Sequence, residues 1–358
     1  RRRGEEVMIR KQSNSSWYKL IAGVTIIALL LAGCSFGPGK IQGETPSETG
    51  QDLLKVGLII GEGGISDPYY QKAWESLQKA EQELQIGVGY LGAKSDKDYR
   101  SCLAEFKKQK YDVVITIGQS IVPAVLEAAK DNPEIKYICL DSGNLDTPVP
   151  GNVLAVTYKV EEAAFLAGYL AGKMTKSYVV GFVSGDNKEA AQRYYYGFKA
   201  GIRYSNNNVE TMKGIAGTFT KKSRLKEMAE RMIVSKADVL FHVAGPAGEG
   251  LIEVAARSGK YIIGSGTDQR DLAPENVLTS VVVNNEQIVY DLLALLKANN
   301  LKFGKTAAFG LAENAVGLTE FAEGKVPEYT IDQLLAVKEK IVAGDIAVPA
   351  NENEYLGI

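Results

Sequence analysis

Short, uninterrupted apolar runs alternate with amphipathic stretches along most of this chain of 358 residues. The first set of runs lies at 55–60, 86–92, 112–118 and 136–141. These runs are rich in β-branched residues and are continuous, whereas a strand with one solvated face would alternate apolar with polar residues. We therefore expect parallel strands that are covered by helices on both faces, which is a doubly wound α/β arrangement.

The same alternation begins again in the second half of the sequence. Its apolar runs lie at 152–159, 178–185, 237–245, 260–266 and 276–283. After them come a helical pattern near 285–299, a strand-like segment at 307–318 and a helical pattern near 330–343. We expect this last part to cross between two α/β lobes as a multi-stranded hinge. The predicted lobes comprise 54–157 with 284–303, and 158–283 with 304–350, and they leave a ligand cleft between them.

The N-terminal segment has the pattern of a lipoprotein signal peptide. Basic residues precede the apolar run 20–33, which is short for a membrane span and ends in "LLAG" before Cys34. This ending matches the lipobox of bacterial lipoproteins. We predict a signal peptide at 1–33, with translation starting at Met8, and a lipid anchor on Cys34 that holds the protein on the extracytoplasmic face of the cell membrane.

The segment after Cys34 is predicted to be a flexible tether that extends to residue 53. It consists largely of Gly, Pro, Ser, Thr and Glu, and such a composition buries too little apolar surface to become ordered. Because Cys34 is used for lipid attachment, Cys102 and Cys139 are the cysteines left for the folded part. Both lie in apolar patterns, so we expect two buried free thiols and no disulfide.

Composition and charge argue against several functional classes. The 41 basic and 43 acidic residues give a net charge of −2, which does not suggest a nucleic-acid partner. A single histidine, His242, and three cysteines offer little material for a transition-metal site, and no cofactor is expected. His242 lies inside an apolar run and is interpreted as a hydrogen-bonded core residue. Without a second histidine no further Ser–His pair can form, so we predict that the protein is not an enzyme.

The glycine-rich segment 61–66 follows the first predicted strand and invites comparison with phosphate-binding loops. Ser66 stands where a dinucleotide fingerprint needs its third glycine, and Glu62 places negative charge where a pyrophosphate would lie. No Gly-Lys-Ser/Thr follows, which argues against a P-loop. The segment is interpreted as a turn at the edge of the cleft, and Asp67 and Pro68 then begin a helix.

Polar and aromatic residues gather at the ends of the predicted strands, where parallel sheets bind ligands. The two carboxylates among them, Asp141 and Asp268, are expected on opposite lobes as hydrogen-bond acceptors. Aromatic rings combined with a carboxylate and amides suit a flat, polar, uncharged molecule such as a nucleobase. The candidate ligand-binding residues are Asp67, Tyr70, Gln71, Gln119, Asp141, Tyr194, Gly245 and Asp268.

Several long segments resemble the BMP (basic membrane protein) family of bacterial lipoproteins. They include "KVGLIIGEGGISDPYYQKAWESL", "DVVITIGQSIVPAVLEAAKDNPEIKYICLD", "ADVLFHVAGPAGEGLIEVAARSGKYIIG" and "TDQRDLAPENVLTS". The resemblance implies a type I periplasmic-binding-protein fold and a substrate-binding protein of an ABC importer, of which many are specific for purine nucleosides. It places Tyr70 and Tyr194 at the two rings that sandwich the base and Asp141 at the aspartate that contacts the ring edge. Gln71 occupies the position of a family asparagine.

The chain departs from the family pattern at four positions. Gly61 and Ser66 stand where relatives carry aspartates. Gly266 replaces an aspartate that the resemblance assigns to ribose binding, and Val283 replaces a lysine with the same role. The base-binding half of the site is therefore retained and the sugar-binding half is not. A nucleoside held differently, a free base and another small ligand all stay open.

We predict a lipid-anchored substrate-binding protein that closes two lobes around a nucleoside or related small ligand and presents it to ABC permease subunits. The main alternative is an anchored sensor or regulatory binding protein that is not coupled to import, or one with a non-nucleoside ligand. An enzyme acting on nucleosides would need a catalytic group beyond the Asp and Glu candidates of this chain. A regulator of the sugar-repressor type would need a helix-turn-helix where the signal peptide lies.

Overall fold

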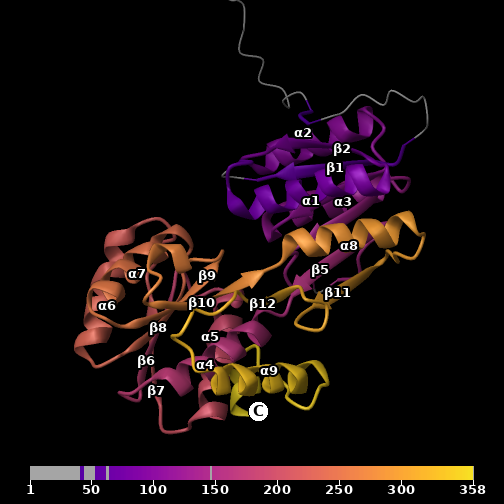
Figure 1. Cartoon of the computed structure of the whole chain (residues 1–358). Helices are drawn as coiled ribbons and strands as arrows, with labels where there is room; N and C mark the ends of the chain where they lie inside the picture. Colours follow the sequence, from indigo (N-terminus) through magenta and orange to yellow (C-terminus); the bar gives the residue numbers. More distant parts are fainter. Residues whose placement is uncertain (1–40, 44–52, 62–63, 146, 358) are drawn as a thin grey trace, which may run out of the picture. The chain divides into compact units, whose positions relative to one another are not determined.

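The strands sort into two six-stranded sheets that share one connection order. The computed structural model describes residues 41–43, 53–61, 64–145 and 147–357. In these residues the first sheet has the order β11-β5-β4-β3-β1-β2 and the second the order β12-β10-β9-β8-β6-β7 (Figure 1). All neighbouring strands are parallel except the pair β10–β12. The predicted α/β fold with two doubly wound lobes is confirmed.

The first lobe is built around the first sheet. Its strands are β1 (Lys55–Ile60), β2 (Gly87–Gly92), β3 (Val113–Ile117), β4 (Lys136–Leu140), β5 (Val153–Tyr158) and β11 (Lys305–Phe309). Its helices are α1 (Pro68–Leu84), α2 (Asp96–Lys108), the short η1 (Gln119–Ile121), α3 (Val122–Asp131) and α8 (Asn285–Lys297). The predicted helix start at Pro68 and the predicted helices near 96–109 and 285–299 are confirmed.

The second lobe is built around the second sheet. Its strands are β6 (Val179–Ser184), β7 (Glu210–Ile215), β8 (Val239–Val243), β9 (Tyr261–Gly266), β10 (Val277–Val283) and β12 (Val316–Leu318). Its helices are α4 (Val160–Met174), α5 (Glu189–Ser205), α6 (Lys222–Val234), η2 (Gly245–Ala247), α7 (Gly248–Arg257), η3 (Arg270–Leu272), α9 (Glu328–Val342) and α10 (Glu352–Leu356). Strand β7 was not predicted, because this polar edge strand lacks a continuous apolar run, and helix α6, which follows it, was not predicted either.

Three chain segments cross between the two sheets, at the junctions β5–α4, β10–α8 and β11–β12 (Figure 1). Backbone hydrogen bonds join them: the N–H of Lys159 donates to Phe309 O (2.8 Å) and that of Asn284 to Ala315 O (2.8 Å). This is the multi-stranded connection that the sequence predicts. The segment 307–318, however, forms two strands in different sheets. With β11 in the first sheet, the expected start of the second lobe at residue 304 does not match the strand topology.

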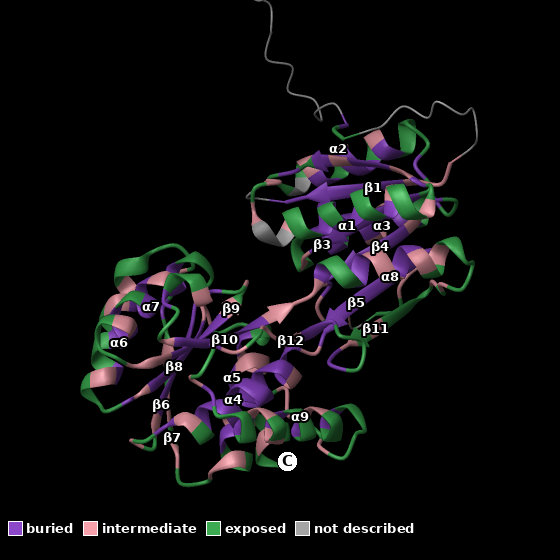
Figure 2. Cartoon of the chain, in the orientation of Figure 1, coloured by how far each residue is buried: buried purple, intermediate pink, exposed green. Residues whose placement is uncertain are grey.

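The cores agree with the continuous apolar runs. Every residue of β3 and β5 is buried, as parallel strands covered on both faces require. Figure 2 shows buried strands under helices whose outer faces are exposed. Cys102 and Cys139 are buried and free, as predicted. In the described part of the chain, no helix combines the length and the apolar character that a membrane span needs.

Residues 41–43 correct the prediction of a wholly flexible tether. Gln42 forms an antiparallel bridge with Tyr90 on β2, with backbone hydrogen bonds of 3.1 and 3.0 Å in the two directions. Ile41 is buried beside it. Strand β2 is a sheet edge with unpaired backbone groups, and Ile41 supplies an apolar side chain, so this short piece adds to the edge. The prediction of a flexible tether is wrong for these three residues. The signal peptide and Cys34 lie outside the described residues.

Helices α4 and α5 approach each other through glycines. A Cβ added at Gly168 would lie 1.9 Å from the backbone O of Phe198, and one at Gly201 would lie 2.0 Å from the backbone O of Phe165. Only glycine permits this separation. At the start of α4, a Cβ added at Gly197 would lie 2.3 Å from the backbone O of Glu161, so the close packing also holds α5 against this end of α4.

Candidate functional site

Asp141 stands at the end of β4, where it begins the loop that leaves the first sheet. Its φ of 52° lies in the left-handed region, which aspartate tolerates better than most residues. Strained backbone of this kind occurs often at binding sites. The same loop meets the second lobe, because the Asn144 side-chain amide donates a hydrogen bond to Glu189 at the start of α5.

Three tyrosines share the electrostatic environment of Asp141. Burial, the neighbouring Tyr99 and the acids Asp67 and Asp141 raise the pKa of Tyr70 to about 12, although a hydrogen bond with the Gly61 backbone opposes the shift. Burial raises the pKa of Tyr194 well above its ordinary value, with further contributions from Asp141 and Glu161. Tyr70 belongs to the first lobe and Tyr194 to the second. The structure therefore brings together three predicted residues from both lobes.

Tyr158 completes this group, which we call the tyrosine cluster (Tyr70, Tyr158, Tyr194 and Asp141). Burial and the charge of Asp141 raise the pKa of Tyr158 well above its ordinary value. Its hydroxyl donates to Asn285 Oδ1 at 2.7 Å, at the first residue of α8. All three phenols stay protonated at neutral pH, so each presents an O–H group near one carboxylate.

The other predicted residues have separate positions. Gln71 is exposed and its side-chain amide donates to Glu75 Oε1 (2.9 Å) along α1. Gln119 is exposed and packs beside Gly143 in the loop after β4. Gly245 opens η2 with a φ of 52°. Asp67 accepts the backbone N–H of Tyr70 (3.0 Å) through its own carbonyl oxygen at the start of α1. Only Asp67 among these four contributes to the pKa of a cluster tyrosine.

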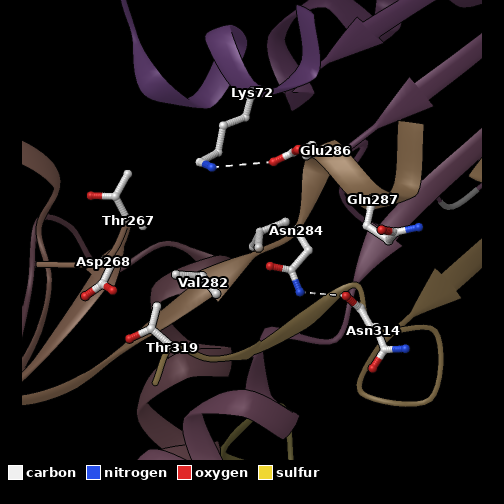
Figure 3. Close-up of a pocket in the computed structure, with 11 residues that line it drawn as sticks. Lys72, Thr267, Asp268, Val282, Asn284, Glu286, Gln287, Asn314 and Thr319 are labelled. Carbon is white, nitrogen blue, oxygen red and sulfur yellow. Dashed lines mark hydrogen bonds and ion pairs between the residues drawn. The ribbon is translucent and has the colours of Figure 1, made fainter. Parts of the chain in front are cut away.

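A cavity of about 560 Å³ opens at the β10–α8 crossing, and we call it the hinge pocket. Its volume lies within the range of small-molecule sites. Asp268 is the predicted candidate residue that lines it. Residues from both lobes and from the crossing segments form its walls (Figure 3): Lys72, Gly266, Thr267, Asp268, Val282, Val283, Asn284, Glu286, Gln287, Asn314 and Thr319.

The charged groups of the hinge pocket are paired. Lys72 Nζ lies 3.5 Å from Glu286 Oε2, and both side chains are about half exposed, at 55% and 53%. Figure 3 shows Lys72 extending from α1 to Glu286, with Thr267 and Asp268 on the opposite side of the view. Arg270 donates to both carboxylate oxygens of Asp268, at 2.6–3.0 Å. These bonds hold the pKa of Asp268 below its usual range.

A buried network supports the second-lobe wall of the hinge pocket. His242 Nε2 donates to Gln269 Oε1 at 2.9 Å, and the same oxygen accepts the backbone N–H of Ser265 at 3.1 Å. The Gln269 backbone N–H donates to Ser280 Oγ at 3.1 Å. Burial lowers the pKa of His242 to about 4, so the ring is neutral at pH 7. His242 is a hydrogen-bonded core residue, as predicted.

Gly266 and Val283 line the hinge pocket without a polar side chain. Gly266 has a φ of 84°, which lies in the left-handed region that favours glycine. In the described residues, no three His, Cys, Asp or Glu side chains gather where they could hold a metal ion.

Comparison with known proteins identifies the family. The family described as "ABC transporter substrate-binding protein PnrA-like" matches residues 54–352. The chain belongs to this family. Basic membrane protein A of Borreliella burgdorferi is 31% identical over 94% of this chain and 97% of its own length. Basic membrane protein B of the same organism is 33% identical over 93% and 96%. The resemblance to the BMP family is confirmed.

Solved structures support the fold. A solute-binding protein of an ABC transporter system from Aeropyrum pernix K1 has a TM-score of 0.66 at 21% identity, over 85% of this chain and 96% of its own. One from Conexibacter woesei has a TM-score of 0.69 at 20% identity, over 84% and 100%. A transcriptional activator of the comK gene from Bacillus halodurans reaches 0.70 at 18% identity, over 82% and 99%. At these identities the likeness concerns the fold.

Sequence reasoning missed Tyr158, Lys72 and Glu286. Tyr158 ends a predicted strand, so its position was available as a signal. Lys72 and Glu286 lie on helices, and the search for candidates followed strand ends. Their pairing depends on how α1 packs against α8, and no local sequence pattern predicts that packing.

Proposed function

We propose that this ABC substrate-binding protein binds a purine nucleoside or its base in the tyrosine cluster and delivers it to a permease for import. The observation that carries the proposal is the placement of Asp141, whose charge raises the pKa of tyrosines from both lobes. Aromatic faces supply stacking area, and a carboxylate accepts hydrogen bonds from ring N–H groups. A ligand held by both lobes would favour their closed arrangement.

Lipid attachment at Cys34 belongs to the same proposal. The signal-peptide pattern before Cys34 supports it, and the two relatives above are named basic membrane proteins. In cells, Cys34→Ala is expected to move the protein from the membrane fraction to the soluble fraction and to abolish incorporation of a labelled fatty acid. Retention of both properties by the variant would contradict the anchor.

Binding is tested by isothermal titration calorimetry of the chain from residue 35 with adenosine, guanosine, inosine and their free bases. We expect Asp141→Asn to weaken the bound ligand by about tenfold or more, because removing one partner of a charged hydrogen bond costs about 1.5–3 kcal/mol. Tyr70→Ala should weaken the ligand by a similar factor, because it removes a stacking ring and its contact area. Asp345→Asn and Tyr329→Ala are matched controls, since both residues are exposed and lie outside the tyrosine cluster.

Two outcomes would contradict the proposal. The first is wild-type protein that binds none of the nucleosides or bases. The second is affinity that is unchanged in both cluster variants. Incubation with adenosine followed by chromatography adds a separate check on chemistry, because release of free base would show an enzyme.

A further inference from the structure

One edge of the first sheet is an uncharged strand. Strand β2 ends the sheet order, and its sequence Gly-Val-Gly-Tyr-Leu-Gly carries no charged side chain. The corresponding edge strand of the second sheet, β7, carries Glu210 and Lys213. Charged side chains keep an exposed edge from pairing with another strand, whereas an uncharged edge needs a cover. In the part of the chain that the structure describes, residues 41–43 provide this cover.

Residues 41–43 contact the edge through side chains as well as through the backbone. The Tyr90 hydroxyl donates to Gln42 Oε1 at 2.7 Å, in addition to the two backbone hydrogen bonds between the same residues. Ile41 is only 6% exposed and belongs to the core cluster to which α2 contributes. A Cβ added at Gly89 would lie 2.6 Å from Ile41 Cγ2, so this glycine of β2 makes room for the isoleucine.

Gly43 ends the covering segment against helix α1. Its φ of 74° lies in the left-handed region, and a Cβ at this position would overlap the Trp74 ring. Trp74 is 8% exposed and packs edge-on against Tyr90, with ring centroids 4.9 Å apart, so its ring has little room to move. The position therefore requires glycine, and each of the three residues 41–43 makes a specific contact with the first lobe.

We propose that residues 41–43 form a latch that holds the tether on β2, so that the chain between the lipid and the folded domain is 34–40 and not 34–53. The first span has seven residues and the second has twenty. At about 3.5 Å per residue, the fully extended spans reach about 25 Å and about 70 Å. The latch therefore keeps the β2 edge close to the membrane surface. This inference rests on the lipid anchor at Cys34, which is part of the proposed function.

A shorter tether changes how the protein meets a membrane partner. The permease subunits expected for this family lie in the same membrane as the anchor, so their encounter with the tethered protein is governed by an effective concentration. This concentration falls as a linker grows longer than the span that it must cover. With the latch closed, the protein is presented at a higher local concentration and over a narrower range of orientations.

Proteolysis tests the latch without any lipid. Lys40 precedes Ile41 in the sequence, and trypsin can cut the bond between them only when Ile41 leaves β2. In the chain from residue 35, we expect mass spectrometry to show this cleavage about tenfold faster in Gly43→Ala and in Ile41→Asp than in wild type. Gly324→Ala and Val234→Asp are matched controls. Gly324 also has a positive φ but no atom within 4 Å of an added Cβ, and Val234 is 85% exposed.

Energy transfer to labelled lipid measures the length of the tether. A chain from residue 34 contains every described residue and a single tryptophan, Trp74, which lies beside the latch. Cys34 is coupled to a maleimide lipid in vesicles, whereas Cys102 and Cys139 are buried. We expect the efficiency of transfer from Trp74 to a dansyl lipid to fall about twofold or more in Ile41→Asp, because an opened latch lengthens the tether.

Each alternative result is decisive. Equal cleavage rates in wild type and in both latch variants overturn the latch. Faster cleavage with unchanged energy transfer shows a latch that does not set the distance to the membrane, and this also overturns the proposal. Protection from trypsin that rises with protein concentration places residues 41–43 on β2 of a second copy and overturns it as well. If native Cys34 carries no lipid in cells, the anchor and the role of the latch both fail, while the trypsin result still stands.

Discussion

The tyrosine cluster and the hinge pocket lie at neighbouring positions of the fold but hold their charges differently. Near the cluster, Arg193 and Glu161 form a bidentate pair at 2.7 and 2.8 Å, with side chains only 14% and 7% exposed. In the pocket, Lys72 and Glu286 are more than half exposed and 3.5 Å apart. The first pair is largely removed from solvent, and the second is screened by it.

This difference suggests a division of labour between the two regions. Arg193 and Glu161 cannot separate without leaving a buried charge unpaired, so this pair holds α4 and α5 in one arrangement beside the cluster. Lys72 and Glu286 can separate at small cost, because solvent screens both of their charges. Stability measurements separate the two regions without any ligand.

Breaking the buried pair has the largest expected effect. Arg193→Met leaves the Glu161 carboxylate buried without its partner, and we expect the free energy of unfolding to fall by about 3–5 kcal/mol. Urea denaturation followed by circular dichroism measures this change. Arg100→Met is the control, because its pair with Glu127 is 57% and 63% exposed and its loss should cost less than about 1 kcal/mol. If Arg193→Met and Arg100→Met lowered the free energy of unfolding by similar amounts, the buried pair would be no more important for stability than the exposed one.

A double variant sharpens the same experiment. Arg193→Met combined with Glu161→Gln removes both charges, and part of the lost stability should return, since no buried charge is left unpaired. If the double variant is as unstable as the sum of the single ones, the pair contributes through packing alone.

Much of the fold was predictable because its information is local. Continuous apolar runs predicted nine of the strands in the described residues, and Asp67-Pro68 predicted the start of α1. Strand β7 escaped because its residues are polar and largely exposed. The division of 307–318 into β11 and β12 was not predicted, because the six residues between them, 310–315, contain no proline and no run of turn-forming residues. The two strands join different sheets, and this depends on contacts with residues that are distant in sequence.

The candidate site was predictable where its residues lie at the ends of strands. Asp141, Tyr70 and Tyr194 come from strand ends and helix starts, which parallel topology places on one side of each sheet. Gln71 was placed at the site by its neighbours, but on a helix it turns to Glu75 one turn later. Lys72 and Glu286 are 214 positions apart, and only the packing of α1 on α8 brings them together. The small-residue spacing Gly168–Gly172 and Gly197–Gly201 was an available signal for the close α4–α5 contact.

The next largest expected effect is a loss of stability in acid, caused by the buried His242 behind the hinge pocket. Because burial lowers the pKa of His242 to about 4 from an ordinary 6.5, the unfolded chain binds more protons between these values. The contribution of His242 to stability is therefore complete above pH 6.5 and lost as the pH falls toward 4. We expect a loss of about 2 kcal/mol from this group between pH 7 and pH 5.

Denaturant midpoints at several pH values check the histidine. His242→Asn, which keeps a side-chain donor for Gln269, should reduce the pH dependence in this window although it lowers stability overall. A pH profile that is equally steep in wild type and variant would assign the effect to other groups.

The exposed pair of the hinge pocket should give the smallest effect. Lys72→Met and Glu286→Gln are each expected to change the free energy of unfolding by at most about 1 kcal/mol, because solvent screens a half-exposed pair. The coupling energy from a double-mutant cycle should fall further when salt is raised from 0.05 to about 0.5 M. A coupling above about 2 kcal/mol would mean that the pair is as fixed as Arg193–Glu161, and the pocket would then lack the freedom to exchange its partners for a ligand.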